Sequence, residues 1–177
     1  MTHVDGLGIS DTALWDERGR IGAPHRHCWW ERGRRLPPVA YFKDADEVYK
    51  YIGRLFVQLA EDEELAPKFR KANTIVQYQY REPESQITVK LIEGEDGQVD
   101  CGETNMEPEV VMTMEADTAH RFWLGKVNVT VALARGQMKA RGPVAKILKL
   151  VPLTKPIFPR YRALLEQNGR EDLIEAA

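Results

Sequence analysis

Two neighbouring segments that alternate between apolar and polar residues restrict the fold of this chain more than any other feature. In residues 74–81, TIVQYQYR, valine and tyrosine alternate with glutamine, and in residues 86–92, QITVKLI, aliphatic residues alternate with threonine and lysine. Alternation with a period of two predicts strands that each have one buried face. Residues 82–85 are short enough to connect the two strands as a hairpin. Because sheets with one wet face are typically antiparallel, we expect an antiparallel sheet.

A helical period precedes these strands. Asp44, followed three residues later by Glu47, is typical of the start of a helix. Apolar residues then recur at steps of three and four: Val48, Tyr51, Ile52, Leu55, Phe56 and Leu59. This spacing predicts an amphipathic helix with one buried stripe. A polar stretch with a short second helix leads from there to the hairpin.

The rest of the chain adds strands and short helices. We expect strands near 99–101 and 109–115, followed by a helix that Asp117 caps and Gly125 ends. A helix over 129–135 and a strand at 137–141 come next. A helix from Pro143, with a stripe of Val144, Ile147, Leu148 and Val151, and a last helix that ends near Gly169 complete the chain. This order predicts an α+β domain whose helices gather against one face of the sheet.

Residues 1–40 form an N-terminal arm of different character, rich in glycine, proline, tryptophan and arginine and without a sustained period. The sequence Glu-Arg-Gly-Arg occurs twice in it, beginning at Glu17 and at Glu31. One interpretation is that the arm folds over its own domain. The other is that it docks to a protein partner, because tryptophans flanked by arginines combine an apolar anchor with charged donors. The docking candidates are Trp15, Arg18, Trp29, Trp30 and Arg32.

Composition and motifs argue against several classes of protein. A net charge of −2 is unlike that of a general nucleic-acid binder, which needs a basic excess. No apolar run reaches the length of a membrane-spanning helix, and the first ten residues lack the layout of a secretory signal. The two cysteines, Cys28 and Cys101, lie far apart, and His25 and His27 beside Cys28 do not easily complete a zinc shell. We therefore expect a cytoplasmic protein without metal or cofactor.

A chain of small motifs in the second half resembles the sterol carrier protein family, of the sterol carrier protein two type, also called the sterol-binding domain. The matching residues are Met112, Thr113, Met114, Ala116, Asp117, Gly125, Lys126, Asn128, Gly136, Lys139, Gly142 and the helix from Lys146 to Leu150. The resemblance extends over about residues 42–165. It implies a five-stranded antiparallel sheet with helices on one face that enclose an apolar tunnel. It also implies non-enzymatic binding and transfer of a sterol, a fatty acid or a fatty acyl thioester by residues 41–177.

The apolar residues of this region have two interpretations, as tunnel lining and as ordinary core. The lining candidates are Met112, Met114, Phe122, Trp123, Val127, Val131, Leu133, Met138, Ile147, Leu148 and Val151. The methionines suit a surface that adapts to a flexible guest. Lys126, Arg135 and Lys139 are candidates for meeting a polar head group at the tunnel mouth, or else they are solvated surface charges. Transient contact with a membrane would accompany lipid transfer.

Two other functions compete with that of a carrier. Asp117 and His120 lie three residues apart on a predicted helix, a spacing that allows an acid–base pair, but no activated nucleophile accompanies them. The alternative is that Asp117 caps the helix while His120 and Arg121 face outward, and we expect no enzyme. The other competing function is an adaptor with a closed tunnel that docks to a larger assembly through the N-terminal arm.

Overall fold

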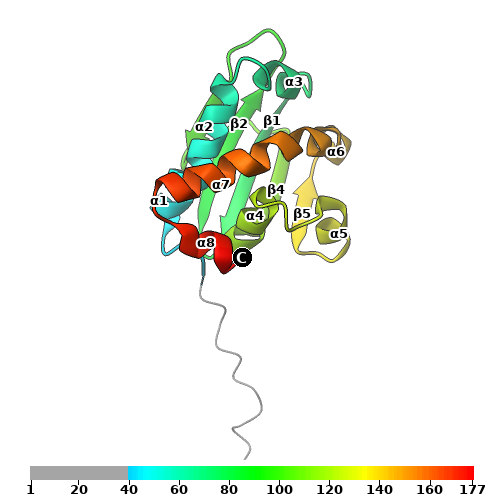
Figure 1. Cartoon of the computed structure of the whole chain (residues 1–177). Helices are drawn as coiled ribbons and strands as arrows, with labels where there is room; N and C mark the ends of the chain where they lie inside the picture. Colours follow the sequence, from blue (N-terminus) through cyan, green and yellow to red (C-terminus); the bar gives the residue numbers. More distant parts are fainter. Residues whose placement is uncertain (1–39) are drawn as a thin grey trace, which may run out of the picture. The chain divides into compact units, whose positions relative to one another are not determined.

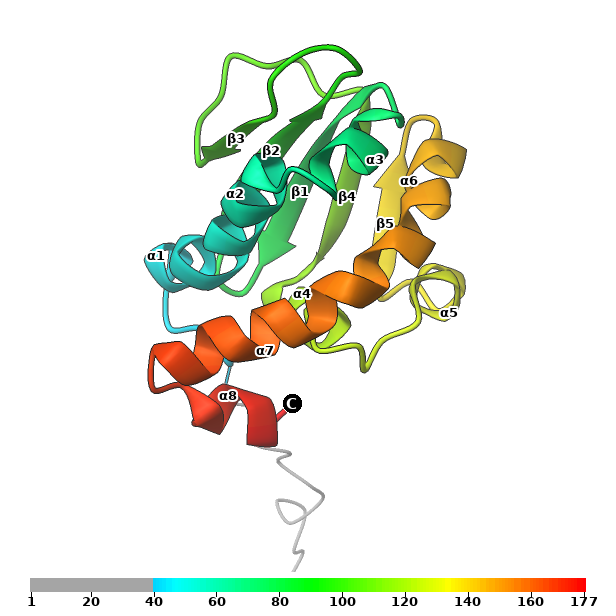
Figure 2. The same cartoon turned by 45° about the horizontal axis from the view of Figure 1, so that its top comes forward.

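The computed structural model of the chain describes residues 40–177, which form an α+β unit with helices packed on one face of a five-stranded sheet (Figures 1 and 2). The N-terminal arm with its docking candidates Trp15, Arg18, Trp29, Trp30 and Arg32, and the group His25, His27 and Cys28, lie outside the described residues. Within residues 40–177, no helix has both the length and the apolar character needed to cross a membrane.

The sheet contains all five predicted strands. They are β1 (Thr74–Arg81), β2 (Ser85–Leu91), β3 (Gln98–Cys101), β4 (Val110–Glu115) and β5 (Met138–Arg141), in the spatial order β3-β2-β1-β4-β5. The predicted hairpin is confirmed, with Val76 of β1 opposite Val89 of β2 in an antiparallel pair. The expectation of a wholly antiparallel sheet is wrong at one place, because β1 and β4 are parallel, with Tyr78 opposite Met112.

The parallel pair follows from the connection between β3 and β4. β3 lies at the edge beside β2, whereas β4 lies beyond β1, so residues 102–109 must pass both β2 and β1. β3 and β4 run in the same direction, so this connection also returns along the length of the sheet before β4 begins. Alternation in the sequence identifies the buried face of a strand but contains no information on its direction. The sequence therefore predicted the strands and their faces, but not this pairing.

The predicted amphipathic helix begins at Asp44, as expected. Asp44 Oδ1 accepts a hydrogen bond from the Glu47 N–H at 3.0 Å, and Glu47 Oε2 accepts one from the Lys43 N–H at 2.9 Å. The six residues of its predicted apolar stripe are all buried. The helix is continuous through α1 (Ala45–Val48), a π-helical turn η1 (Tyr49–Gly53) and α2 (Arg54–Glu61), and a short helix α3 (Ala66–Arg70) follows. Nothing in the apolar spacing indicated the π-helical turn.

Helix α4 (Ala116–Trp123) follows β4 without a loop, and this changes the role of Asp117. Asp117 is not the cap that we predicted, because Glu115 occupies that position and makes no side-chain capping bond. Instead, Asp117 Oδ1 accepts a hydrogen bond from the Tyr41 N–H at 3.0 Å. Gly125 turns the chain after the helix with a φ of +77°, and a Cβ atom there would lie 3.0 Å from the Phe158 ring.

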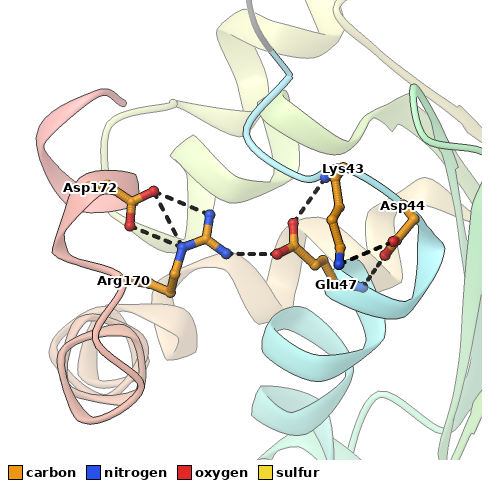
Figure 3. Close-up of polar contacts among 5 residues, drawn as sticks. All are labelled: Lys43, Asp44, Glu47, Arg170 and Asp172. Carbon is orange, nitrogen blue, oxygen red and sulfur yellow. Dashed lines mark hydrogen bonds and ion pairs between the residues drawn. The ribbon is translucent and has the colours of Figure 1, made fainter.

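The remaining helices complete the layer over the sheet. They are α5 (Val129–Ala134), α6 (Val144–Leu150), the 3-10 helix η2 (Val151–Ile157), α7 (Phe158–Gln167) and α8 (Glu171–Glu175). Asn128 caps α5, since its Oδ1 accepts from the Val131 N–H at 3.2 Å. At the end of the chain, Arg170 pairs with Glu47 at 2.8 Å and with Asp172 at 2.9 Å, which ties α8 to the start of α1 (Figure 3).

Candidate lipid-binding site

An apolar cavity of about 60 Å³ lies between the sheet and the helices. The strands contribute Tyr78, Tyr80, Val89, Leu91, Met112, Met114 and Met138. The helices contribute Phe56, Leu59, Phe69, Ala119, Phe122, Trp123, Val129, Ile147, Leu150, Val151 and Thr154. Every second side chain of a strand lies on the same face of the sheet. Residues of four different strands therefore meet at this cavity.

The structure brings most of the predicted lining residues together at this cavity. Met112, Met114, Phe122, Trp123, Met138, Ile147 and Val151 line it. Phe122 and Val151 are half-buried, whereas the other five residues are buried. The three methionines come from β4 and β5, where Met114 and Met138 lie opposite each other in the antiparallel pair.

The other four predicted residues lie elsewhere. Helix α5 turns Val129 and Ala132 inward, so that Val131 is 43% exposed and Leu133 is only half-buried. Helix α6 likewise buries Ile147 and Leu150, and Leu148, one position on from Ile147, is 40% exposed. Val127 precedes α5 and lines a separate groove. These helices are so short that apolar spacing alone did not determine which of their faces is buried.

Sequence analysis missed the contribution of the first half of the chain. Tyr78 and Tyr80 of β1 and Val89 of β2 lie on the same sheet face as the methionines, and Phe56 comes from the buried stripe of α2. The alternation in β1 and β2 was a sufficient signal for these residues.

The cavity wall contains few polar groups and no charged side chain among the described residues. Thr154 satisfies its hydroxyl by donating to the Val151 oxygen at 2.7 Å. The hydroxyl of Tyr80 is buried and has no hydrogen-bond partner within residues 40–177. Burial raises the pKa of Tyr80 well above its usual value, so this phenol is neutral at physiological pH. The cavity therefore favours hydrocarbon, and an ionised carboxylate inside it would be costly.

Aromatic rings occupy a large part of the surrounding space. The ring of Trp123 lies edge-on to those of Phe56 and Phe122, with ring centroids 5.3 Å and 4.8 Å apart. Phe56 stacks on Tyr78, with centroids 4.9 Å apart. A dry apolar cavity that holds one benzene ring has a volume of about 150 Å³. The cavity of about 60 Å³ is smaller than that, so a lipid can enter only if the walls move apart.

The three head-group candidates do not form one site at the cavity. Lys126 donates from Nζ to the Ile174 oxygen at 3.2 Å and to the Ala177 oxygen at 2.6 Å, and so holds the C-terminal segment. Arg135 lies with Lys126 in the separate groove beside α5. Lys139 follows Met138 on β5 and points to the opposite face of the sheet, because strand side chains alternate.

The structure agrees with neither interpretation of Asp117 and His120, as an acid–base pair or as a helix cap beside an outward-facing histidine. His120 is fully buried rather than outward-facing, and each of its ring nitrogens has a partner: Nδ1 lies 2.8 Å from the Tyr161 hydroxyl and Nε2 lies 2.8 Å from the Leu173 oxygen. Burial lowers the pKa of His120 from 6.5 to about 4. Asp117 bonds to Tyr41 instead, so the two side chains do not form an acid–base pair.

Arg121 also differs from the expectation in part, because it is half-buried rather than fully outward-facing. Within residues 40–177, no three His, Cys, Asp or Glu side chains are grouped in a way that could hold a metal ion.

A sequence model described as the SCP-2 sterol transfer family matches residues 53–155, and the chain belongs to this family. Among solved structures, it is similar to sterol carrier protein 2 of Yarrowia lipolytica in its apo form, with 20% identity and a TM-score of 0.50 over 60% of this chain and 88% of the other. It is also similar to sterol carrier protein domain 2 of Helicoverpa armigera, with 23% identity and a TM-score of 0.52 over 64% and 89%. A search of curated proteins found no match. The solved structures share the fold of this chain, and membership of the family indicates lipid or sterol binding and transfer.

Proposed function

We propose that this protein binds one lipid molecule in the apolar cavity and transfers it without chemistry of its own. The observation that carries the proposal is the apolar lining, to which the sheet and several helices contribute and which contains no charged group within residues 40–177. Sterols, fatty acids and fatty acyl thioesters all offer the hydrocarbon that such a wall accepts. The polar end of an ionised ligand would remain at the surface, where water solvates it.

The energetics suit reversible transfer. Burying one methylene contributes about 0.8 kcal/mol, so a chain of about 16 carbons gains roughly 10 kcal/mol before ordering costs. Leaving a bilayer costs the lipid a similar amount, because the bilayer interior is also apolar. The exchange between membrane and protein is therefore nearly balanced. A carrier needs this balance, since it must release what it has bound.

Entry of a lipid requires the cavity to widen, and the segment α6–η2 is the part of the wall that we expect to move. It supplies Ile147, Leu150, Val151 and Thr154, all from one continuous stretch of chain. Its second half is a 3-10 helix, whose hydrogen bonds have poorer geometry than those of an α-helix. The segment also ends beside Phe158, the residue that packs on Gly125 at the end of α4.

A matched pair of tryptophan substitutions tests the proposal. Ile147→Trp places a large ring in the cavity, whereas Leu148→Trp places the same ring at the neighbouring position, which is 40% exposed and outside the cavity. We expect the unmodified protein to bind a fluorescent fatty acid or a fluorescent sterol at one site. Ile147→Trp should weaken this binding roughly 10-fold or more, and Leu148→Trp should leave it unchanged. Equal effects of the two substitutions, or no binding of either lipid by the unmodified protein, would contradict the proposal.

The adaptor function is a second candidate, and the small cavity volume favours it. Under this alternative the cavity is part of the core and the N-terminal arm recruits a partner. Deletion of residues 1–40 separates the two functions. The carrier predicts that lipid binding survives the deletion, while the adaptor predicts that partner association is lost and that no lipid binds to either form.

A further inference from the structure

The charges of this chain are segregated along the sequence. Residues 118–165 contain ten lysines and arginines and no aspartate or glutamate, so that all 27 acidic residues lie outside this segment. The segment comprises most of α4 and all of α5, β5, α6 and η2, together with most of α7. A net charge of −2 for the whole chain therefore conceals one strongly basic part.

Three of these basic residues meet at one groove between α4 and α5. Arg121 comes from the last turn of α4, Lys126 from the loop after it, and Arg135 from the end of α5. The groove has a volume of about 280 Å³, and Val127 and Val131 also line it. Among the described residues that line the groove, none is acidic. Arg121 and Arg135 therefore have no carboxylate partner within the groove, whereas Lys126 is held by the oxygens of Ile174 and Ala177.

Helix α5 separates this groove from the apolar cavity. Val129 lines the cavity on one side of the helix, while Val131 and Arg135, four residues apart and hence on one helical face, line the groove on the other. Val131 is 43% exposed, and only Leu148 matches it as an exposed large apolar residue within the described part of the chain. An exposed apolar side chain beside cations suits the head-group region of an anionic bilayer, where phosphates pair with the cations and apolar groups are partly buried.

We propose that the groove and the outer face of α5 dock to the surface of an anionic membrane. Arg121 and Arg135 would meet lipid phosphates, and Val131 would enter the head-group layer. The proposal rests on the carrier function, since docking here places the helix that walls the cavity against the source of lipid. A nucleic acid fits less well, because the part of the groove formed by residues 40–177 contains no aromatic side chain for base stacking.

Flotation with lipid vesicles tests the proposal. We expect the full chain to float with vesicles of phosphatidylcholine and phosphatidylglycerol and not with phosphatidylcholine alone. Added salt should weaken this binding, because it screens the charges. Arg135→Glu should weaken it roughly 10-fold or more, since each basic residue near such a surface contributes about 1 kcal/mol. Val131→Ser should also weaken it. Lys126 is a poor choice for substitution, because it holds the C-terminal segment.

Lys71→Glu is the matched control. Lys71 is exposed at the end of α3, which lies well apart from α5, and the charge change is the same (Figures 1 and 2). Equal weakening by Lys71→Glu and Arg135→Glu would overturn the proposal, as would equal binding to neutral vesicles. Tighter binding to a duplex oligonucleotide than to anionic vesicles, lost in Arg135→Glu, would also overturn it in favour of a nucleic-acid partner.

Two readouts on the unmodified protein separate this proposal from the carrier function. Binding of a fluorescent fatty acid or sterol in solution without flotation on anionic vesicles would leave the carrier function in place and reject the docking surface. Flotation without binding of either soluble lipid would reject the carrier function and retain the docking surface.

Discussion

The Nε2 atom of His120 lies 2.8 Å from the backbone oxygen of Leu173, so that a buried histidine of α4 holds α8 in place. A carbonyl only accepts hydrogen bonds, and Nε2 must therefore carry the proton. Nδ1 then accepts from the Tyr161 hydroxyl at 2.8 Å. The neutral ring satisfies both partners, and this is the form that burial favours. The histidine that suggested catalysis in the sequence therefore has a structural role.

This arrangement predicts a loss of stability in mild acid. The pKa of His120 is lowered from 6.5 to about 4 in the folded protein, chiefly by burial. Between pH 6.5 and 4, His120 therefore binds a proton in the unfolded chain but not in the folded protein. The contribution of His120 to the free energy of unfolding is complete above pH 6.5. It decreases by roughly 3 kcal/mol as the pH falls toward 4. Urea unfolding at a series of pH values measures this slope.

His120→Gln supplies the control for this slope, because glutamine keeps a donor and an acceptor but does not titrate in this range. Subtracting the variant's profile removes the contribution of carboxylates that titrate nearby. Parallel profiles for the two proteins between pH 6.5 and 4 would show that His120 is not the group responsible.

The tyrosines of the core predict opposite effects on stability. The buried Tyr80 hydroxyl has no partner among the described residues, so Tyr80→Phe should raise the free energy of unfolding by about 1 kcal/mol. The Tyr161 hydroxyl bonds to His120, so Tyr161→Phe should lower that free energy by about 1 kcal/mol or more. Chemical denaturation measures both. A destabilised Tyr80→Phe would mean that its hydroxyl has a partner in solution.

Two glycines with similar backbone conformations should respond differently to alanine. Gly142 has a φ of +91°, and a Cβ atom there would lie 2.1 Å from the Glu109 oxygen. Gly136 has a φ of +71°, but no atom of the described residues lies within 4 Å of a Cβ atom placed there. We expect Gly136→Ala to cost about 1 kcal/mol from the left-handed conformation alone. Gly142→Ala should cost roughly 3 kcal/mol or more, because the backbone must also shift. Thermal unfolding that ranks them in the reverse order would contradict this.

The ion pairs of Arg170 should make a measurable contribution to stability. Arg170 is half-buried and bonds to both Glu47 and Asp172, which connects the two ends of the described fold (Figure 3). We expect Arg170→Met to lower the free energy of unfolding by roughly 1–2 kcal/mol, and less in high salt. Arg162→Met, at an exposed position of α7, should change it very little. Equal losses in the two variants would indicate that the ion pairs contribute nothing.

Much of the fold was predictable because it depends on local patterns. Alternation identified β1 and β2 and the face that each buries, and the steps of three and four identified the stripe from Val48 to Leu59. Asp44 and Asn128 each accept the capping hydrogen bond that suits their residue type. Met112, Met114 and Met138, which were lining candidates because methionine suits an adaptable surface, line the cavity.

What the sequence by itself determined is therefore where the elements lie and which residues of the longer ones face inward, since these properties depend on neighbours a few positions apart. The parallel pairing of β1 with β4, the burial of His120 under Leu173 and the exposure of Val131 and Leu148 were decided only by the tertiary structure. Each depends on segments that lie far apart in the chain and meet only on folding. The periodicity of a six- or seven-residue helix is too short to specify its buried face, so its packing partners specify it instead.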